Sequence, residues 1–380
     1  MQKIKGFVKH IIKPDRFLYK AIRKIYHFVS KQKYKIFNYK KIKKQNIEFE
    51  QRVDEAVKII SEFSEKKYIV FYNPTWLGVA ASTKGLFKYN VPLEQVFGKK
   101  NIDRISNAII NSNIENVIFS QIVDGWTTII EKIKKQKPEI DVKVIWHGNC
   151  YEFFSDYTWN LNKEVMELYN KGYINCFGFV RTTMYEFYKK VGFKSCYLQN
   201  NVHKNVMEKV TNSNDKIKIG IYNADSRELK NIYTSLSAIR MVPNAIADVV
   251  PINEGALEFT NIIGLDVNYE KKYISNDELM KRIQKNDINI YPTYTENAPM
   301  FPLESLEMGV VCLLGNNNDY FVGTELGKYL IIEREDDPLY IKNKIVEALE
   351  NKNKIMSLYR DWKKDFDSKC VEYVKLFINA

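Results

Sequence analysis

The sequence predicts an α/β protein with two Rossmann-like domains that face each other across a cleft, preceded by a basic amphipathic N-terminal helical arm. Three observations lead to this prediction. Short apolar runs alternate with amphipathic helical segments in two successive series, which is typical of parallel, doubly wound sheets. A polar, turn-forming segment, 210–216, separates the two series. The whole excess of positive charge lies before residue 46, and the rest of the chain is close to neutral.

Length and charge predict a division into four parts. A chain of 380 residues is long enough for about two domains. The net charge is +12, but residues 1–45 carry 15 Lys or Arg against the single acid Asp15, so the basic character belongs to an arm. The predicted parts are the arm, 1–50, a first domain, 51–205, a second domain, 206–350, and a C-terminal helix that returns to the first domain, 351–380.

The arm contains two amphipathic helical segments with lysines between their apolar positions. Phe7, Val8, Ile11 and Ile12 fall at helical spacing in the first segment, and neither segment has the run of about 18 apolar residues that would span a bilayer. Such a helix suits the surface of an anionic membrane. Two alternatives remain: the apolar face packs on the body of the protein, or the arm binds nucleic acid, which we do not expect.

The first series of elements begins with the strand Tyr68–Tyr72, and the helix that follows starts near Gly78. No G-x-G-x-x-G follows this strand, which disfavours a dinucleotide site there. The further predicted strands are Asn116–Ser120, Val142–Trp146, Cys176–Val180 and Cys196–Leu198. The predicted helices are Val79–Tyr89, Trp126–Lys135, Met166–Tyr173 and Thr182–Val191. The aromatic stretch Tyr151–Asn160 is either core or part of a binding surface.

The second series follows the polar segment. Its predicted strands are Ile217–Tyr222, Ile288–Tyr291, Val310–Leu314 and Tyr329–Ile332. Its predicted helices are Leu229–Met241, Asn276–Lys285 with Ser275 as N-cap, a short helix within 302–308, and Pro338–Glu350. In the short helix we expect Pro302 to be the first residue, because a proline there loses no intrahelical hydrogen bond. Gly309 is placed to cap its C-terminus.

Two carboxylates, Glu296 and Glu304, lie in this strand–loop–helix unit and are separated by seven residues. The unit resembles the E-x7-E signature of retaining GT-B glycosyltransferases of family four, usually written E-G-F-G-x-P-x-x-E-A-M-A-x-G. Glu296, Glu304 and Gly309 fall on matching positions. The family's two glycines are replaced by Asn297 and Pro299, and its proline is displaced by one residue. Without the family context, the two acids would be read as solvated surface residues.

The resemblance implies a nucleotide-sugar site in the second domain. Glu296 would lie near the transferred sugar, and Glu304 would accept hydrogen bonds from the ribose hydroxyls. The N-terminus of the short helix would face the diphosphate, since its N–H groups and dipole favour an anion. Because Pro299 offers no N–H, the phosphate grip is expected either to be looser or to be supplied by Ala298, Met300 and side chains such as that of Asn297.

Further residues are assigned by the same resemblance. Lys230 matches the family lysine that neutralises the donor diphosphate, and Arg227 stands near the position of the family arginine, which is Asp225 here. The plain alternative for both is a charged surface turn. His147 directly follows a strand and matches a family histidine that contacts the transferred sugar. The alternative is that it is an ordinary histidine of a loop, with no role in binding. In the family the loop after the first strand faces the cleft between the domains, and from this position Gly78 is assigned to the donor site.

We therefore expect a hexosyl- or related glycosyltransferase that moves a sugar from a nucleotide-diphosphate sugar, with retention, to a membrane-associated acceptor such as a lipid-linked saccharide or a cell-surface glycan precursor. Such an enzyme would act in polysaccharide biosynthesis as a peripheral protein on the cytoplasmic face of the membrane. The alternatives are a sugar-nucleotide epimerase on the same fold and a catalytically silent subunit that recruits a partner transferase to the membrane.

No cofactor or metal is expected besides the nucleotide-sugar donor. The only D-x-D triplet, Asp365–Asp367, lies in the C-terminal helical stretch and not at a strand end, and the four histidines show no metal-ligand spacing. The five cysteines are scattered without C-x-x-C spacing, which indicates free, mostly buried thiols in a reducing compartment.

Overall fold

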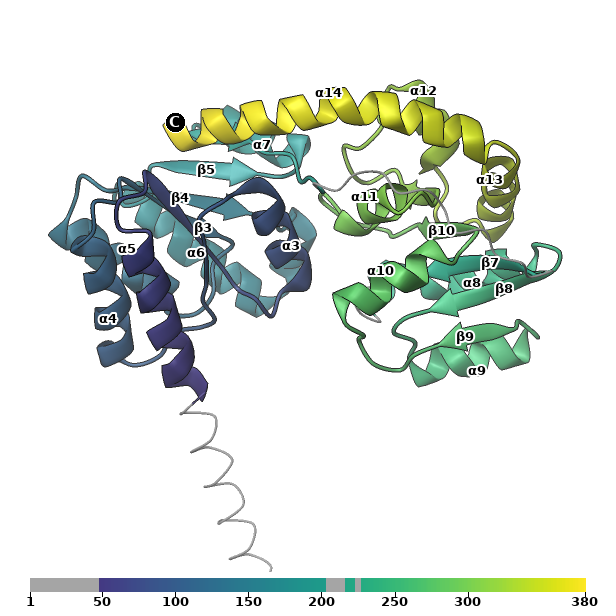
Figure 1. Ribbon diagram of the computed structural model, residues 1–380, viewed down its shortest axis with the longest axis horizontal. Coiled ribbons are helices and arrows are strands. Elements are labelled where there is room, and N and C mark those ends of the chain that lie inside the picture. The colour runs from purple at the N-terminus through teal and green to yellow at the C-terminus, as the bar shows by residue number, and fades with distance from the viewer. Residues whose placement is uncertain (1–47, 203–215, 223–226) are drawn as a thin grey trace, which may run out of the picture. The chain divides into compact units, whose positions relative to one another are not determined.

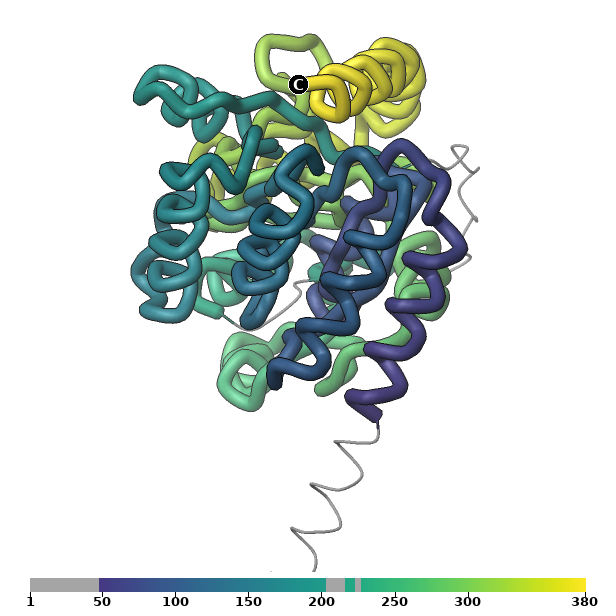
Figure 2. Tube along the Cα trace, turned by 90° about the vertical axis from the view of Figure 1, so that its left-hand side faces the viewer, coloured from purple at the N-terminus to yellow at the C-terminus, as the bar shows by residue number. Residues whose placement is uncertain are grey.

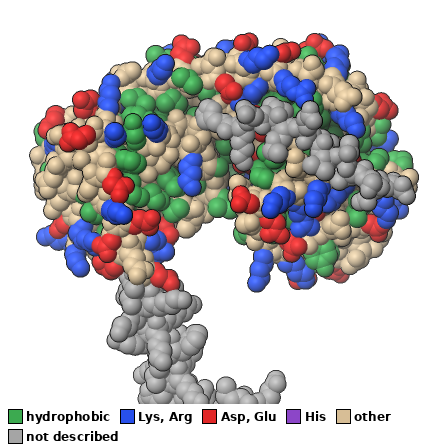
Figure 3. Space-filling model, viewed as in Figure 1, with side chains coloured by type: hydrophobic (Ala, Val, Ile, Leu, Met, Phe, Trp, Pro, Cys, Tyr) green, Lys and Arg blue, Asp and Glu red, His purple; other side chains and the backbone are tan. Residues whose placement is uncertain are grey.

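The computed structural model describes residues 48–202, 216–222 and 227–380 (Figure 1). The chain divides into two compact units, 1–58 and 59–380. Of the predicted arm, residues 1–50, all but 48–50 lie outside the described residues (grey in Figure 3), and a helix over 48–62 leads into the first strand. The elements below belong to the second unit. None of the helices described is long and apolar enough to cross a membrane.

The first sheet has six parallel strands in the order β2-β1-β3-β4-β5-β6. Its middle strand β3 is buried along its whole length, as expected for a parallel sheet covered by helices on both faces. The chain order reverses between β1 and β3, which makes a topological switch point there. The strands are β1 (Tyr68–Tyr72), β2 (Asn90–Pro92), β3 (Asn116–Ser120), β4 (Asp141–Trp146), β5 (Cys176–Phe179) and β6 (Ser195–Tyr197).

Helices α4, α5 and α6 pack side by side on this sheet, as the blue and teal tubes of Figure 2 show. The helices are α3 (Leu77–Leu86), α4 (Lys99–Ile110), α5 (Trp126–Gln136), the 3-10 helix η1 (Cys150–Phe154), α6 (Asp156–Asn170) and α7 (Thr182–Lys190). The predicted start of a helix at Met166 is wrong, because α6 begins at Asp156. Its buried positions Leu161, Val165 and Leu168 have helical spacing, but exposed aromatics in the first turns obscure the pattern.

The second sheet is also parallel, with the order β12-β11-β10-β7-β8-β9. Its chain order reverses between β7 and β10, so the loops that follow these two strands flank the second switch point. The strands are β7 (Ile217–Ile221), β8 (Ala245–Val249), β9 (Val267–Tyr269), β10 (Ile288–Tyr291), β11 (Cys312–Gly315) and β12 (Ile331–Ile332). The predicted strand Tyr329–Ile332 is too long, because its first two residues end a helix.

The helices of the second domain differ from prediction mainly at their starts. They are the 3-10 helix η2 (Glu228–Lys230), α8 (Ile232–Arg240), α9 (Glu254–Ile262), α10 (Asn276–Gln284), α11 (Met300–Glu307), α12 (Glu325–Leu330) and α13 (Pro338–Glu350). The predicted helix from Leu229 is split at Asn231, whose φ is 55°. Helix α11 begins at Met300, so Pro302 is its third residue, where a missing N–H still costs no intrahelical bond.

The last helix, α14 (Lys352–Asn379), packs on both domains (Figure 1). Its first half contributes Ile355, Tyr359 and Phe366 to the core of the second domain. Near its end, Phe377 is fully buried among residues of the first sheet. The buried Lys143 of β4 donates to the backbone oxygen of Ile378 (3.2 Å), which fixes the helix end to the first domain.

Candidate active site

Helix α11 follows the loop 292–299, which leaves the carboxyl end of β10. At its other end the N–H of Gly309 donates to Leu306 O (3.0 Å), and the N–H of Val310 donates to Ser305 O (3.0 Å). These are the two bonds of a Schellman motif, and Gly309 has the positive φ, 76°, that the motif requires. The predicted cap at Gly309 is therefore confirmed.

Four hydrogen bonds join the loop 292–299 to the first domain. In two of them the acceptor is a backbone oxygen of the loop. In a third, a side chain of the loop donates to a backbone oxygen of the first domain. The bonds are Asn149 Nδ2 to Thr295 Oγ1 (2.9 Å), Arg181 Nη1 to Glu296 O (2.8 Å), Asn297 Nδ2 to His147 O (2.6 Å) and Asn200 Nδ2 to Ala298 O (2.8 Å). The loop that carries Glu296 is thus positioned by side chains of both domains.

Lys230, Glu296 and Tyr291 form a hydrogen-bonded triangle at the second switch point. Lys230 forms a short ion pair with Glu296 Oε1, and its Nζ donates to the Tyr291 hydroxyl (2.9 Å). That hydroxyl donates in turn to Glu296 Oε1 (2.7 Å). The Lys230 and Glu296 side chains are only 8% and 16% exposed, so their charges are largely withdrawn from water and interact strongly. The triangle fixes both charges at the wall of a pocket.

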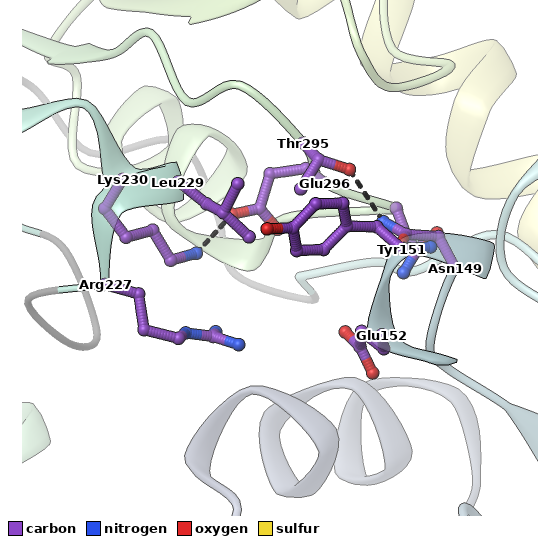
Figure 4. A pocket seen from close by; sticks show the side chains of 9 residues that line it. Asn149, Tyr151, Glu152, Arg227, Leu229, Lys230, Thr295 and Glu296 are labelled. Atoms are coloured by element: carbon purple, nitrogen blue, oxygen red, sulfur yellow. Dashed lines mark hydrogen bonds and ion pairs between the residues drawn. The ribbon is translucent and has the colours of Figure 1, made fainter. Parts of the chain in front are cut away.

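The pocket lies between the two domains, and Figure 4 shows its side chains. Arg227 points into it from the second domain, and Glu152 of η1 points into it from the opposite side. Burial raises the pKa of Glu152, and the charges of Arg227 and Lys230 oppose this increase. The lining residues are Asn149, Tyr151, Glu152, Arg227, Leu229, Lys230, Thr295, Glu296 and Asn297. Two cations and two carboxylates therefore border one space.

His147 follows β4 and is held in a defined tautomer by a chain of hydroxyls. Thr83 Oγ1 donates its only hydrogen to Val79 O (2.7 Å), so at 2.6 Å from Ser120 it must accept from the Ser120 hydroxyl. Ser120 Oγ then accepts from His147 Nε2 (2.9 Å). Burial lowers the pKa of His147 to about 4, so the ring is neutral at pH 7. With the hydrogen on Nε2, Nδ1 is left as a hydrogen-bond acceptor.

The predicted site residues fall into three groups. Arg227, Lys230, Glu296 and Asn297 line the pocket, and His147 is joined to it through the Asn297 bond. Ala298, Met300 and Glu304 belong to the loop and α11 beside it and do not line it. The Met300 side chain is buried in the core, so only its backbone is suited to contact a ligand. Gly78 is exposed in the first turn of α3.

Sequence reasoning assigned no role to three pocket residues, Asn149, Leu229 and Thr295, whereas Tyr151 and Glu152 belong to the stretch that was predicted to be either core or part of a binding surface. Asn149 and the two residues on η1 directly follow His147, so the strand-end rule that selected the histidine also applies to them. Arg181 was missed as well, although it follows β5 at the same edge of the sheet. Their contacts depend on the approach of two domains, which no local pattern reveals.

The fold is similar to that of solved glycosyltransferases. Sucrose-phosphate synthase from Thermosynechococcus elongatus superposes with a TM-score of 0.53 at 12% identity, over 77% of this chain and 84% of that one. A TarM variant from S. aureus, solved with fondaparinux, α-GlcNAc-glycerol and UDP, gives a TM-score of 0.50 at 13% identity, over 69% of this chain and 55% of that one. No protein-family model and no curated protein sequence matches. The chain has the GT-B fold, as predicted.

Proposed function

We propose that the protein is a retaining glycosyltransferase that uses a nucleotide-diphosphate sugar. The observation that carries the proposal is the pocket at the second switch point, where Lys230 and Arg227 stand beside Glu296 and face Glu152 of the other domain. Cations at this point suit a diphosphate, and arginine grips phosphate oxygens bidentately. The neighbouring carboxylates suit the hydroxyls of a sugar. The GT-B fold of solved glycosyltransferases agrees with this assignment but does not by itself determine the activity.

In the proposed reaction the bond between the anomeric carbon and the diphosphate oxygen breaks, and a bond from that carbon to the acceptor oxygen forms on the same face. The departing diphosphate takes the acceptor's proton. Lys230 and Arg227 offset the charge that develops on the diphosphate, and the first turn of α11 adds N–H dipoles from Met300 onward. Glu296 and His147 Nδ1 orient the sugar, and Glu304 holds the ribose. No metal ion is assigned a role.

The acceptor in this proposal is associated with a membrane, and the basic arm brings the pocket to the cytoplasmic face of an anionic bilayer. The sequence of residues 1–45 supports this role of the arm, because it contains 15 basic residues and two amphipathic segments. Deletion of residues 1–45 should abolish sedimentation with vesicles that contain phosphatidylglycerol and leave donor binding intact. Undiminished sedimentation after the deletion would refute this role of the arm.

The test of the activity is a panel of nucleotide-diphosphate sugars. A true donor should raise the melting temperature by mass action, and its nucleotide should be released in the presence of an acceptor. Glu296→Ala should lose turnover, whereas Glu258→Ala, an exposed acid on α9, should keep it. Binding without release would favour the silent subunit, and conversion of the sugar without release would favour an epimerase. NMR of the product's anomeric proton tests retention.

A further inference from the structure

A group of exposed aromatic side chains lies on η1 and the first turn of α6. Tyr151, Phe154 and Trp159 are 48%, 85% and 43% exposed, and we call these three residues the aromatic surface. Three large exposed rings on one short segment are unusual for a surface without a partner, since isolated exposed apolar residues are normal but gathered ones mark binding sites.

The aromatic surface is held in place by the fold. The Trp159 ring lies 5.8 Å from that of Phe153, which lies 6.1 Å from the buried Trp146 at the end of β4. The Tyr151 and Phe154 rings are 5.4 Å apart. The Tyr151 N–H donates to Asn149 Oδ1 (2.9 Å), which caps η1. The Trp159 ring and the backbone of Tyr151 are thus fixed before any ligand arrives, which lowers the conformational entropy lost on binding.

The aromatic surface is continuous with the candidate active site. Tyr151 and Glu152 are neighbours on η1, and both line the pocket. Figure 4 shows the Tyr151 ring inside the pocket, while Phe154, which it contacts, is almost fully exposed. A ligand that extends out of the pocket past Tyr151 would therefore meet rings.

We propose that this surface binds the apolar chain of an amphipathic acceptor whose hydroxyl-bearing head enters the pocket. The inference rests on the proposed function. Phe154 is the most exposed of the three rings and carries no polar atom, so an apolar chain is the partner that gains most from covering it. The polar pocket residues Asn149 and Glu152 receive the head.

The experiment uses methyl, octyl and dodecyl β-D-glucosides as probes, below their micelle concentrations, with affinities measured by calorimetry on the full chain. Each buried CH2 strengthens binding about fourfold, so octyl glucoside should bind at least about tenfold more tightly than methyl glucoside. Phe154→Ser and Trp159→Ser should each remove most of this gain and leave methyl glucoside binding unchanged. Tyr273→Ser, at a 58% exposed aromatic of the second domain, is the matched control and should keep the gain.

Equal affinities for all three glucosides, or a gain that survives both substitutions, would overturn the proposal. Binding of phosphatidylglycerol vesicles through the same residues, without binding of the monomeric glucosides, would assign the rings to a bilayer surface and overturn it as well. Donor binding is measured on the same samples by thermal shift. If no nucleotide-diphosphate sugar binds the wild type, the proposed function fails. The glucoside affinities still show separately whether binding depends on the length of the apolar chain.

Discussion

The second domain contains two buried charge clusters that differ in how they are built. In the first, Asp248 of β8 is fully buried and bonded to Arg282 Nε (2.9 Å), Lys218 Nζ (3.2 Å) and the Tyr222 hydroxyl (2.6 Å). In the second, Lys230 and Glu296 share Tyr291 and border the pocket. Both contain a carboxylate, a tyrosine and at least one cation, and the second borders the pocket described above.

This difference separates a structural role from a functional one. Lys218 lies in β7, Tyr222 directly follows it and Arg282 lies in α10, so the cluster joins β7, β8 and α10. Burial, followed by the charge of Asp248, raises the pKa of Tyr222, as expected inside a closed site. Glu296 instead lies in the loop that follows β10, and Lys230 lies in η2, on the segment that follows β7. A charged ligand bound in the pocket would therefore meet both groups.

The comparison predicts its largest effect on stability at Asp248. Asp248→Asn leaves two cations near a neutral amide in a closed site, and we expect the free energy of unfolding to fall by about 3–5 kcal/mol. Urea denaturation measures this change. The matched control is Asp266→Asn, which removes an exposed ion pair with Lys216 and should leave the midpoint unchanged. A small change in the free energy of unfolding for Asp248→Asn would contradict the structural role of this cluster.

The second effect concerns turnover. Lys230→Met should lower kcat for the nucleotide-diphosphate sugar by about 10²–10³-fold, the size expected when a preorganised group that stabilises charge on the leaving group is removed. Lys344→Met is the control, because Lys344 of α13 is equally buried and does not line the pocket. Comparable losses of activity in both variants would attribute the effect to folding and not to the site.

The third effect is a pH dependence of stability that arises in the first domain. The pKa of His147 falls from 6.5 to about 4 on folding, so the folded state resists protonation. The contribution of neutral His147 to the free energy of unfolding is complete above pH 6.5 and is lost as the pH falls toward 4. Between pH 7.5 and 5 it should decline by about 2 kcal/mol. Urea denaturation of the wild type and His147→Gln checks this, and equal slopes for the two proteins would contradict it.

The sequence predicted the parts of the site that follow from strand ends and helix signals. Tyr68–Tyr72, Asn116–Ser120 and Ile288–Tyr291 are strands with the predicted bounds, because their apolar runs are buried on both faces. The start of α6 was wrong because its exposed aromatics do not follow the periodicity of a packed face. This departure from pattern marks the aromatic surface, where selection for binding would override the signal for folding.

The contacts between domains could not be predicted. Asn297 replaces a glycine of the family motif, and in the sequence this is only a departure. In the structure its side chain donates to His147 O, 150 residues away, and so joins the loop of Glu296 to the first domain. Similarly, nothing near Asn200 in the sequence indicates that it binds Ala298 O. Periodicity describes one element and its covered face, whereas these bonds depend on how two sheets approach each other.

The smallest effect tests whether the hydroxyl chain behind His147 serves the site. Ser120 and Thr83 are fully buried and do not line the pocket, so a structural role alone would predict lower stability without a specific change at the histidine. If the chain instead selects the tautomer, Ser120→Ala should populate the Nδ1–H form and raise KM for the donor about tenfold, the equivalent of one hydrogen bond. Nitrogen-15 NMR of the imidazole distinguishes the two tautomers directly.

Thr83→Ser keeps both hydroxyl bonds and should behave as the wild type, which separates loss of the chain from loss of packing. A wild-type spectrum with the hydrogen on Nδ1 would mean that the chain runs in the opposite direction. Thr83 Oγ1 and Val79 O would then be two acceptors only 2.7 Å apart, which is unfavourable without a hydrogen between them. The direction of one buried hydroxyl therefore determines which histidine nitrogen can accept a hydrogen bond from the sugar.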